Sequence, residues 1–131
     1  NLQIGYAEED DICFEIPKSS VDHGQKIAAY YFWVFPNMMF NFYPWGLSVN
    51  IVKPVETKKT KIEFISFVWD ESKLDLGAGA DLDKVELEDE EIVQRVQKGV
   101  GSRFYKSGRF SPRMEKGVHH FHTLVTKFMF K

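Results

Sequence analysis

The chain has 131 residues, of which 44% are hydrophobic and 15% aromatic, and its formal net charge at pH 7 is −2. This length allows one domain with a hydrophobic core, and the composition excludes intrinsic disorder. The small net charge gives no overall attraction to nucleic acid or to an anionic membrane, and no apolar run is long enough to span a bilayer. The single cysteine, Cys13, excludes an internal disulfide and any cysteine-based zinc or iron–sulfur site in this chain.

The segments up to residue 70 predict antiparallel strands. The aromatic run from residue 27 to 44 contains Pro36 and Pro44, which exclude one long helix and favour two strands joined at Pro36-Asn37. Further strands are predicted at residues 11–17, 46–54 and 57–70. In the strand at residues 57–70 a change of face is expected at Ser66.

Residues 71–85 lack a firm period, and two helices are predicted after them. The first begins at Glu86 and carries apolar residues at helical spacing up to Val100, after which glycine ends it. The second begins near Met114, and its stripe consists of Val118, Phe121, Leu124, Val125 and Phe128. The expected fold is therefore an α+β domain, with an antiparallel sheet of at least four strands and a long C-terminal helix packed across it.

The segment GVHHFHTLV, residues 117–125, contains three of the four histidines. On a helix His119 and His122 share a face, and a metal site there needs a third ligand, for which Glu115 is the one candidate within the same helix. The other interpretation is that the imidazoles flank the apolar stripe, half buried and hydrogen bonded. We favour this structural interpretation because short motif matches have a high false-positive rate.

The segment ELEDEE, residues 86–91, holds five carboxylates in six positions. Acidic side chains at a helix start stabilise the helix dipole and satisfy free N–H groups, which explains this composition without any ligand. One carboxylate turned inward would ligate a metal, but that needs two more ligands, and the residues alone offer no convincing pair.

Taken together, residues 87–122 resemble the C-terminal end of the catalytic domain of Rieske non-haem iron oxygenases. These are the large subunits of ring-hydroxylating dioxygenases and their choline- and carnitine-monooxygenase-like relatives. The upstream segment at residues 30–54 resembles the strand pair around "FPN" in the same family, and the likeness covers about residues 28 to 125. The matching elements are Glu88-Asp89, Ile92, Val96-Gln97, Gly99, Ser102, Tyr105, Gly108-Arg109, Glu115 and His120-Phe121-His122.

This resemblance implies a helix-grip sheet, here incomplete, above a mononuclear iron that two histidines and one carboxylate hold. The family's carboxylate lies eight residues before the glutamine of the "VQ" pair, and that position is Asp89. The histidines at 119–122 match a structural part of the pattern instead. The iron histidines lie upstream in the family, and His23 has no partner at the required spacing.

The cysteine and histidine pairs of a Rieske cluster are also absent from this chain. The chain begins at Asn1 without a methionine, and we interpret it as a fragment or processed piece. Residues 1–131 are thus expected to be a single domain, the C-terminal part of an oxygenase catalytic domain without its Rieske domain. No cofactor is expected on this piece alone, and alone it is expected to be inactive.

For the parent enzyme the resemblance implies hydroxylation of a small organic substrate, a quaternary amine or an aromatic compound. Electrons derived from NAD(P)H would pass through a ferredoxin or reductase to a [2Fe–2S] Rieske cluster and on to the mononuclear Fe(II), which activates O₂. The parent is expected to be a homo-oligomer, a trimer. No nucleic-acid or membrane partner is expected, and the single cysteine fits a reducing, cytoplasmic compartment.

Two residue sets remain open between a functional and a structural interpretation. Asn37, Met39 and Asn41 would share one face of a strand and line a substrate pocket, but asparagines in a turn and at an edge are equally expected. Arg109 and Glu115 bracket a proline and would pair to fix the approach of the last helix, against the alternative of two solvated charges.

The alternative function is a non-enzymatic carrier of a hydrophobic ligand, because the helix-grip architecture also serves such proteins. A Rieske motif and a two-histidine helix encoded ahead of Asn1 would favour the oxygenase, and their absence would favour the carrier.

Overall fold

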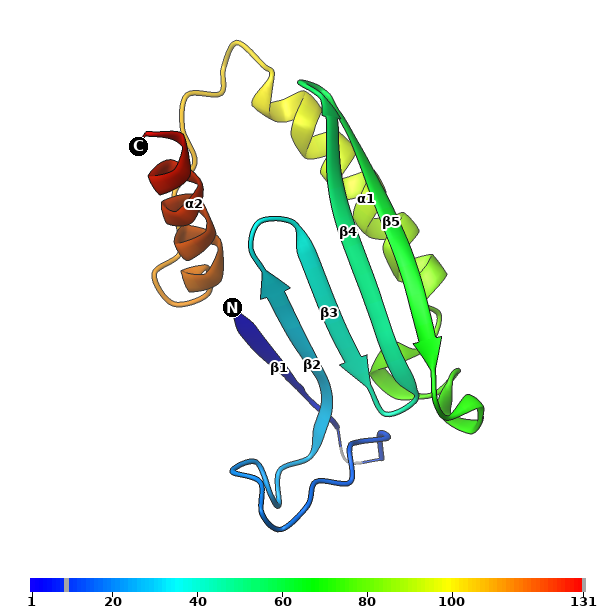
Figure 1. The fold of residues 1–131 in the computed structure, drawn as a ribbon. Helices are drawn as coiled ribbons and strands as arrows, with labels where there is room; N and C mark the ends of the chain where they lie inside the picture. Colours follow the sequence, from blue (N-terminus) through cyan, green and yellow to red (C-terminus); the bar gives the residue numbers. More distant parts are fainter. Residues whose placement is uncertain (9, 131) are drawn as a thin grey trace. The chain divides into compact units, whose positions relative to one another are not determined.

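The computed structural model describes residues 1–8 and 10–130, which form two compact units: a sheet unit, Asn1–Ala80, and a helical unit that begins at Asp81 (Figure 1). The sheet unit contains β1 (Leu2–Tyr6), β2 (Ile27–Val34), β3 (Met38–Tyr43), β4 (Gly46–Glu56), β5 (Lys59–Val68) and the short 3-10 helices η1 (Glu71–Lys73) and η2 (Gly77–Gly79). The helical unit contains α1 (Leu82–Val100) and α2 (Lys116–Met129). Neither helix is long and apolar enough to cross a membrane within the part of the chain that the structure describes.

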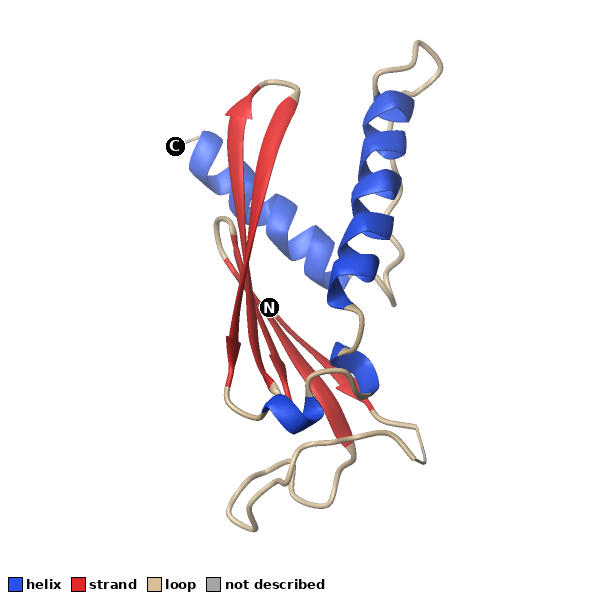
Figure 2. Cartoon of the chain, turned by 90° about the vertical axis from the view of Figure 1, so that its right-hand side faces the viewer, coloured by secondary structure: helices blue, strands red, loops and turns tan. Residues whose placement is uncertain are grey.

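The five strands form one antiparallel sheet in the order β1-β2-β3-β4-β5, so each strand pairs with its neighbour in the sequence. The strands, drawn in red in Figure 2, twist as antiparallel strands do. The predicted antiparallel sheet is therefore confirmed, and so is the hairpin at Pro36-Asn37. The short connections from β2 to β5 favour this topology, because adjacent strands can pair without a crossover.

Two details of the predicted sheet are wrong. Residues 11–17 form no strand, and the first strand is β1 instead; its pairing with β2 runs from Leu2↔Phe32 to Tyr6↔Ile27 and occupies that edge. The expected change of face at Ser66 is also absent, because the pairing of β4 with β5 continues regularly through Ser66↔Ser48. The irregularity between these strands lies at Pro54–Glu56, where a proline cannot donate to the ladder.

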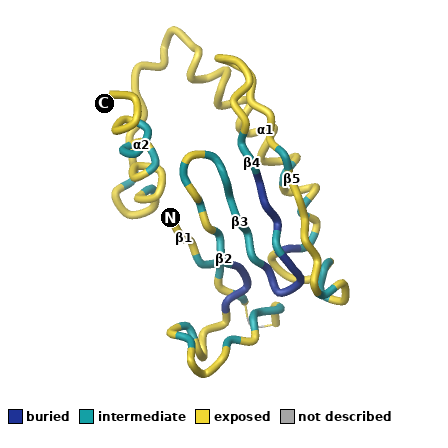
Figure 3. Tube along the Cα trace, in the orientation of Figure 1, coloured by how far each residue is buried: buried dark blue, intermediate teal, exposed yellow. Residues whose placement is uncertain are grey.

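The buried core of the sheet unit lies at the start of β2, the end of β3 and the start of β4 (dark blue in Figure 3). Here the rings of Tyr43 and Trp45 stack with centroids 5.3 Å apart, and Trp45 is only 1% exposed. Gly79 of η2 lies against both rings: a Cβ at this position would stand 2.1 Å from Trp45 Nε1 and 2.9 Å from Tyr43 Cγ. Only glycine allows this approach of the backbone, which fixes η2 on the end of the sheet.

Helix α1 begins at Leu82, four residues before the predicted start. The carboxylates of residues 86–91 therefore lie within the helix, and the interpretation that they stabilise its start is wrong; the acidic residue of the first turn is Asp83. Glu91 pairs with Arg95 and Glu90 accepts a hydrogen bond from Gln94, one turn further along. Such i,i+4 pairs stabilise a helix along its length.

Helix α2 agrees with the helix predicted from about Met114 to 130. In its apolar stripe Phe121, Leu124 and Val125 are half-buried, whereas Val118 and Phe128 are 46% and 60% exposed. The expected packing of this helix across the sheet would join the helical unit to the sheet unit, and it stays a prediction.

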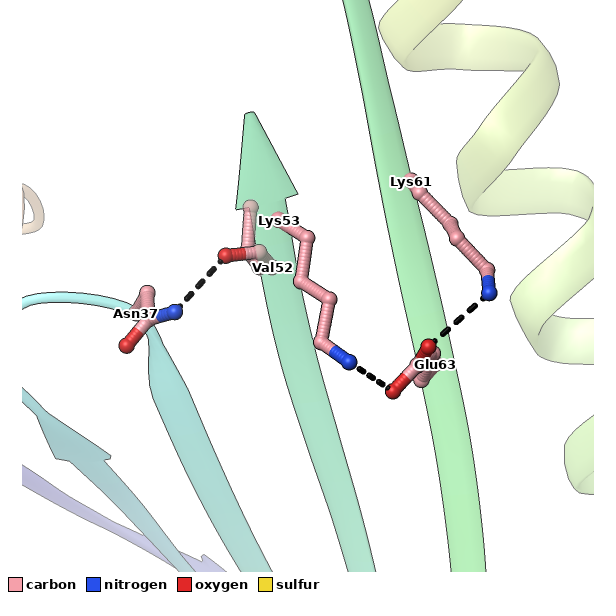
Figure 4. A network of polar contacts seen from close by, with 5 residues as sticks. All are labelled: Asn37, Val52, Lys53, Lys61 and Glu63. Carbon is pink, nitrogen blue, oxygen red and sulfur yellow. Dashed lines mark hydrogen bonds and ion pairs between the residues drawn. The ribbon is translucent and has the colours of Figure 1, made fainter. Parts of the chain in front are cut away.

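A polar network crosses the distal parts of β4 and β5 (Figure 4). Glu63 accepts hydrogen bonds from the ammonium groups of Lys53 and Lys61, the second at 2.9 Å. These bonds lower the pKa of the Glu63 carboxyl from 4.5 to about 2, and the bond from Lys53 has the largest effect. The carboxylate therefore bridges the two strands of the hairpin.

The close approach of Gly79 predicts that Gly79→Ala lowers the free energy of unfolding by about 1–3 kcal/mol, because the new methyl group overlaps the Trp45 indole. The matched control is Gly99→Ala in α1, where a Cβ has nothing within 4 Å. That change should leave stability unchanged or raise it by about 0.5–1 kcal/mol, since alanine favours helix. Chemical denaturation of the chain measures both, and equal stability of the two variants would contradict the packing.

The lowered pKa of Glu63 predicts a pH-dependent contribution to stability. Because the folded-state pKa lies below the unfolded value, this contribution is present above pH 4.5 and is lost as the pH falls toward 2. The stability difference between the wild type and Glu63→Gln should shrink over that window. Carboxyl NMR titration should give a Glu63 midpoint near 2, and Lys53→Met should raise it; a wild-type midpoint near 4.5 would refute the network.

Candidate functional site

One face of the sheet carries a row of neutral polar side chains that crosses all five strands. The strand register places these residues opposite one another in sequence: Gln3↔Tyr31, Tyr31↔Asn41, Asn41↔Ser48 and Ser48↔Ser66. Side chains directly opposite in an antiparallel sheet lie close together on the same face. We call this set the polar row.

The adjacent row on the same face is mostly apolar. It consists of Trp33, Met39, Asn50 and Phe64. Ser48 and Asn50 are 2% and 8% exposed, and the hydroxyl of Ser48 donates to Asn50 Oδ1 at 3.1 Å. This face therefore combines aromatic and thioether surface with a few buried hydrogen-bonding groups, which is the composition of a small-molecule site.

The proposed pocket residues occupy different places in this arrangement. Met39 and Asn41 lie on the same face, as their spacing predicts, and both are half-buried. Asn37 lies in the turn before β3, and its Nδ2 donates to the carbonyl of Val52 at 2.9 Å (Figure 4). Asn37 thus ties the turn to β4, while the pocket role of all three residues stays a prediction.

Sequence reasoning missed Ser48 and Asn50. The pattern that identifies them is two polar residues at i and i+2 within an otherwise apolar strand, SVN between Leu47 and Ile51. Alternation places both on one face, and pairing with β3 brings them beside Met39 and Asn41.

Asp89 lies in the interior of α1 and is exposed. At this position its backbone N–H bonds within the helix, so the carboxylate is not needed as a cap. Among residues 1–8 and 10–130, no group of three histidine, cysteine, aspartate or glutamate side chains is placed to hold a metal ion. The described part of the chain offers single carboxylates such as Asp89, but not a complete iron site.

The histidines of α2 are all exposed, so their expected half-burial is wrong. His119 and His122 share a face of α2, as predicted. The ring of Phe110 packs edge-on against both imidazoles, at centroid distances of 5.1 and 5.2 Å. Glu115, the candidate third ligand, is hydrogen bonded elsewhere. These contacts make the pair part of the loop–helix packing in the helical unit.

The expected pairing of Arg109 with Glu115 is not formed. Glu115 Oε2 instead accepts the backbone N–H of Ser111 at 2.6 Å, and Ser111 Oγ accepts the backbone N–H of Met114 at 3.2 Å. The two side chains thus satisfy backbone donors of the turn that precedes α2. A local backbone donor competes better for the carboxylate than an exposed guanidinium, which water solvates well.

The sheet and the following helices define a protein of the α+β class. A family model described as "Ring hydroxylating alpha subunit (catalytic domain)" matches residues 14–130. The chain belongs to this family.

The curated relatives are chloroplastic choline monooxygenases. That of Arabidopsis thaliana is 36% identical over 102 residues, which are 74% of this chain and 24% of the relative. That of Atriplex hortensis is 36% identical over 100 residues, 72% of this chain and 22% of the relative. The chain thus spans about a quarter of the length of these relatives. No solved structure matches it significantly.

The contacts of Glu115 predict different effects for the two residues that were expected to pair. Glu115→Ala should lower the free energy of unfolding by about 0.5–2 kcal/mol, because it removes the acceptor for the Ser111 N–H. Arg109→Ala should change it by less than about 0.5 kcal/mol. Denaturant titration of both single variants and the double variant measures this, and a coupling energy between the two positions would contradict it.

Proposed function

We propose that this chain is the C-terminal part of the catalytic domain of a Rieske-type mononuclear non-haem iron oxygenase. The observation that carries the proposal is the family match over residues 14–130, together with the order and spacing of the motif that contains Asp89. The parent enzyme would hydroxylate a small organic substrate with O₂. Because the curated relatives are named choline monooxygenases, a quaternary amine is the leading substrate class, ahead of an aromatic compound.

In the parent, Asp89 would be the carboxylate ligand of the iron, together with two histidines outside this chain. Its interior position in α1 supports this role, because the carboxylate is exposed and is not used as a helix cap. Three protein ligands with open positions are needed for oxygen chemistry at such an iron. The donor set of this chain is incomplete, so we assign no chemical step to the chain alone and expect it to be inactive.

The contribution of this chain to the substrate site would come from the sheet. Met39 and Asn41 would form part of the pocket wall, and Asn37 would hold the turn beside them. Tyr31 and Trp33, opposite Asn41 and Met39, offer aromatic faces that would attract a quaternary ammonium group. These residues would orient the substrate and exclude water from it.

The parent would also need a [2Fe–2S] Rieske cluster, which Cys13 alone cannot supply, and a ferredoxin or reductase as electron donor. We propose a homo-oligomer, a trimer, as its assembly. The compartment would be a reducing one: the cytoplasm was expected from the single cysteine, whereas the relatives named above are chloroplastic.

The assignment of Asp89 is tested in the complete oxygenase with its electron donor. Asp89→Ala should reduce hydroxylation by at least about 100-fold and weaken iron retention, because a ligand is lost, while the Rieske cluster spectrum stays intact. Asp89→Asn should also fail, since a neutral amide removes the anionic ligand. The matched control is Glu88→Gln, one residue away on the same exposed helix, which should retain both iron and activity.

Metal analysis of the purified variants and anaerobic titration with ferrous iron give the readouts. Iron retention that survives Asp89→Ala but is lost when His119 and His122 are replaced would place the metal site at the other end of the helical unit. Full hydroxylation by Asp89→Ala would overturn the proposed role of this carboxylate.

A further inference from the structure

Asn50 is a buried polar side chain in which the amide oxygen is hydrogen bonded and the amide nitrogen is not. It is 8% exposed, and its Oδ1 accepts the hydroxyl proton of Ser48 at 3.1 Å. The oxygen side of the amide is therefore committed to β4 itself. Because an amide carries its two N–H donors on the other side, Nδ2 is the group that remains to be satisfied.

None of the described residues accepts a hydrogen bond from Asn50 Nδ2. Nδ2 is not fully buried although the residue is, so it remains within reach of a partner from outside the sheet. A donor that the protein leaves unpaired in this way is satisfied by water or a ligand. Ser48 is itself 2% exposed, and its hydroxyl holds the oxygen side of the amide. In this arrangement Asn50 presents its N–H donors to another partner.

The surroundings of Asn50 show what kind of acceptor fits. Its cross-strand neighbours are Met39 and Phe64, and the polar row beside it contains no charged residue. The charged cluster of Lys53, Lys61 and Glu63 lies on the opposite face, because strand residues of odd and even number alternate. A carboxylate would be left without a counter-ion here, so a neutral hydroxyl or carbonyl oxygen is the fitting acceptor.

We propose that Asn50 is a specificity-determining residue, whose Nδ2 donates to a neutral oxygen of the substrate while Ser48 acts as a positioning residue for the amide. This rests on the proposed function, since it places the substrate on the face that carries Met39 and Asn41. The site would select substrates with a hydroxyl or carbonyl group over otherwise equal molecules that lack it. A polar site of this kind discriminates strongly because its donor is left unpaired by the wrong substrate.

The experiment compares two probes that differ only in this oxygen, choline and ethyltrimethylammonium, on the complete oxygenase. Dissociation constants are measured by calorimetry for the wild type, Asn50→Ala, Asn50→Leu and Ser48→Ala. The wild type should bind choline at least about tenfold more tightly than the deoxy analogue. Both Asn50 variants lack a hydrogen-bonding side chain and add no charge, so they should lose most of that preference through weaker choline binding, with the affinity for the analogue unchanged within about twofold.

Ser48→Ala should reduce the preference partially, because the amide keeps its donors but loses its fixed orientation. Glu63→Gln, on the opposite face, is the control and should keep the full preference. Asn50→Ala removes the amide without adding bulk or charge, so it carries the test if Asn50→Leu fails to fold. Thermal unfolding and the spectrum of the Rieske cluster identify a folded variant.

The outcomes separate this inference from the function on which it rests. If the wild type binds choline but the Asn50 variants keep its preference over the analogue, Asn50 does not determine specificity, while the oxygenase assignment stands. If the wild type hydroxylates an aromatic compound and binds neither probe, the quaternary-amine substrate and this inference both fail. If both probes bind equally to the wild type, the neutral-oxygen contact is refuted.

Discussion

The structure depends above all on the register of the antiparallel strands. Neighbouring strands pair in sequence order, so the positions of the connections decide which residues stand opposite one another. Because side chains alternate between faces, a slip of one residue would move every side chain of a strand to the other face. The pairings Tyr31↔Asn41 and Asn41↔Ser48 therefore bring three strands' polar groups together only in this register. The contact of Gly79 with Trp45 and Tyr43 packs η2 against the buried end of this sheet.

The same alternation separates two kinds of polar chemistry. Lys53, Lys61 and Glu63 form charged pairs on one face near the end of the β4–β5 hairpin, where solvent reaches them. The buried polar atoms of Ser48 and Asn50 lie on the other face and carry no charge. Burying neutral groups that bond to one another costs much less than burying ions. The sheet can therefore present hydrogen-bonding groups beside aromatic rings without an unpaired charge.

The helical unit uses its acidic and polar residues in a different way. Along α1 the carboxylates of Glu90 and Glu91 bond to residues one turn later, and Asp89 between them is left exposed. At the entry to α2 the carboxylate of Glu115 instead accepts a backbone N–H, together with Ser111. Residues of one chemical type thus stabilise the helix, cap a loop or stay available, according to their place in the helix and not their charge.

The sequence by itself determined the strands at residues 27–54, the hairpin at Pro36, the two helices and the family, because periodicity, proline and motif spacing are local properties of the chain. It also predicted that Met39 and Asn41 share a face. It did not predict the start of α1 at Leu82, because residues 71–85 show no firm helical period in the sequence. Only the tertiary structure decided that Glu115 bonds to Ser111, that β1 rather than residues 11–17 pairs with β2, and that Ser48 and Asn50 join the polar face. The first two depend on which of several possible partners forms the more stable hydrogen bonds, and the third depends on the strand register. Both are settled only in the folded chain.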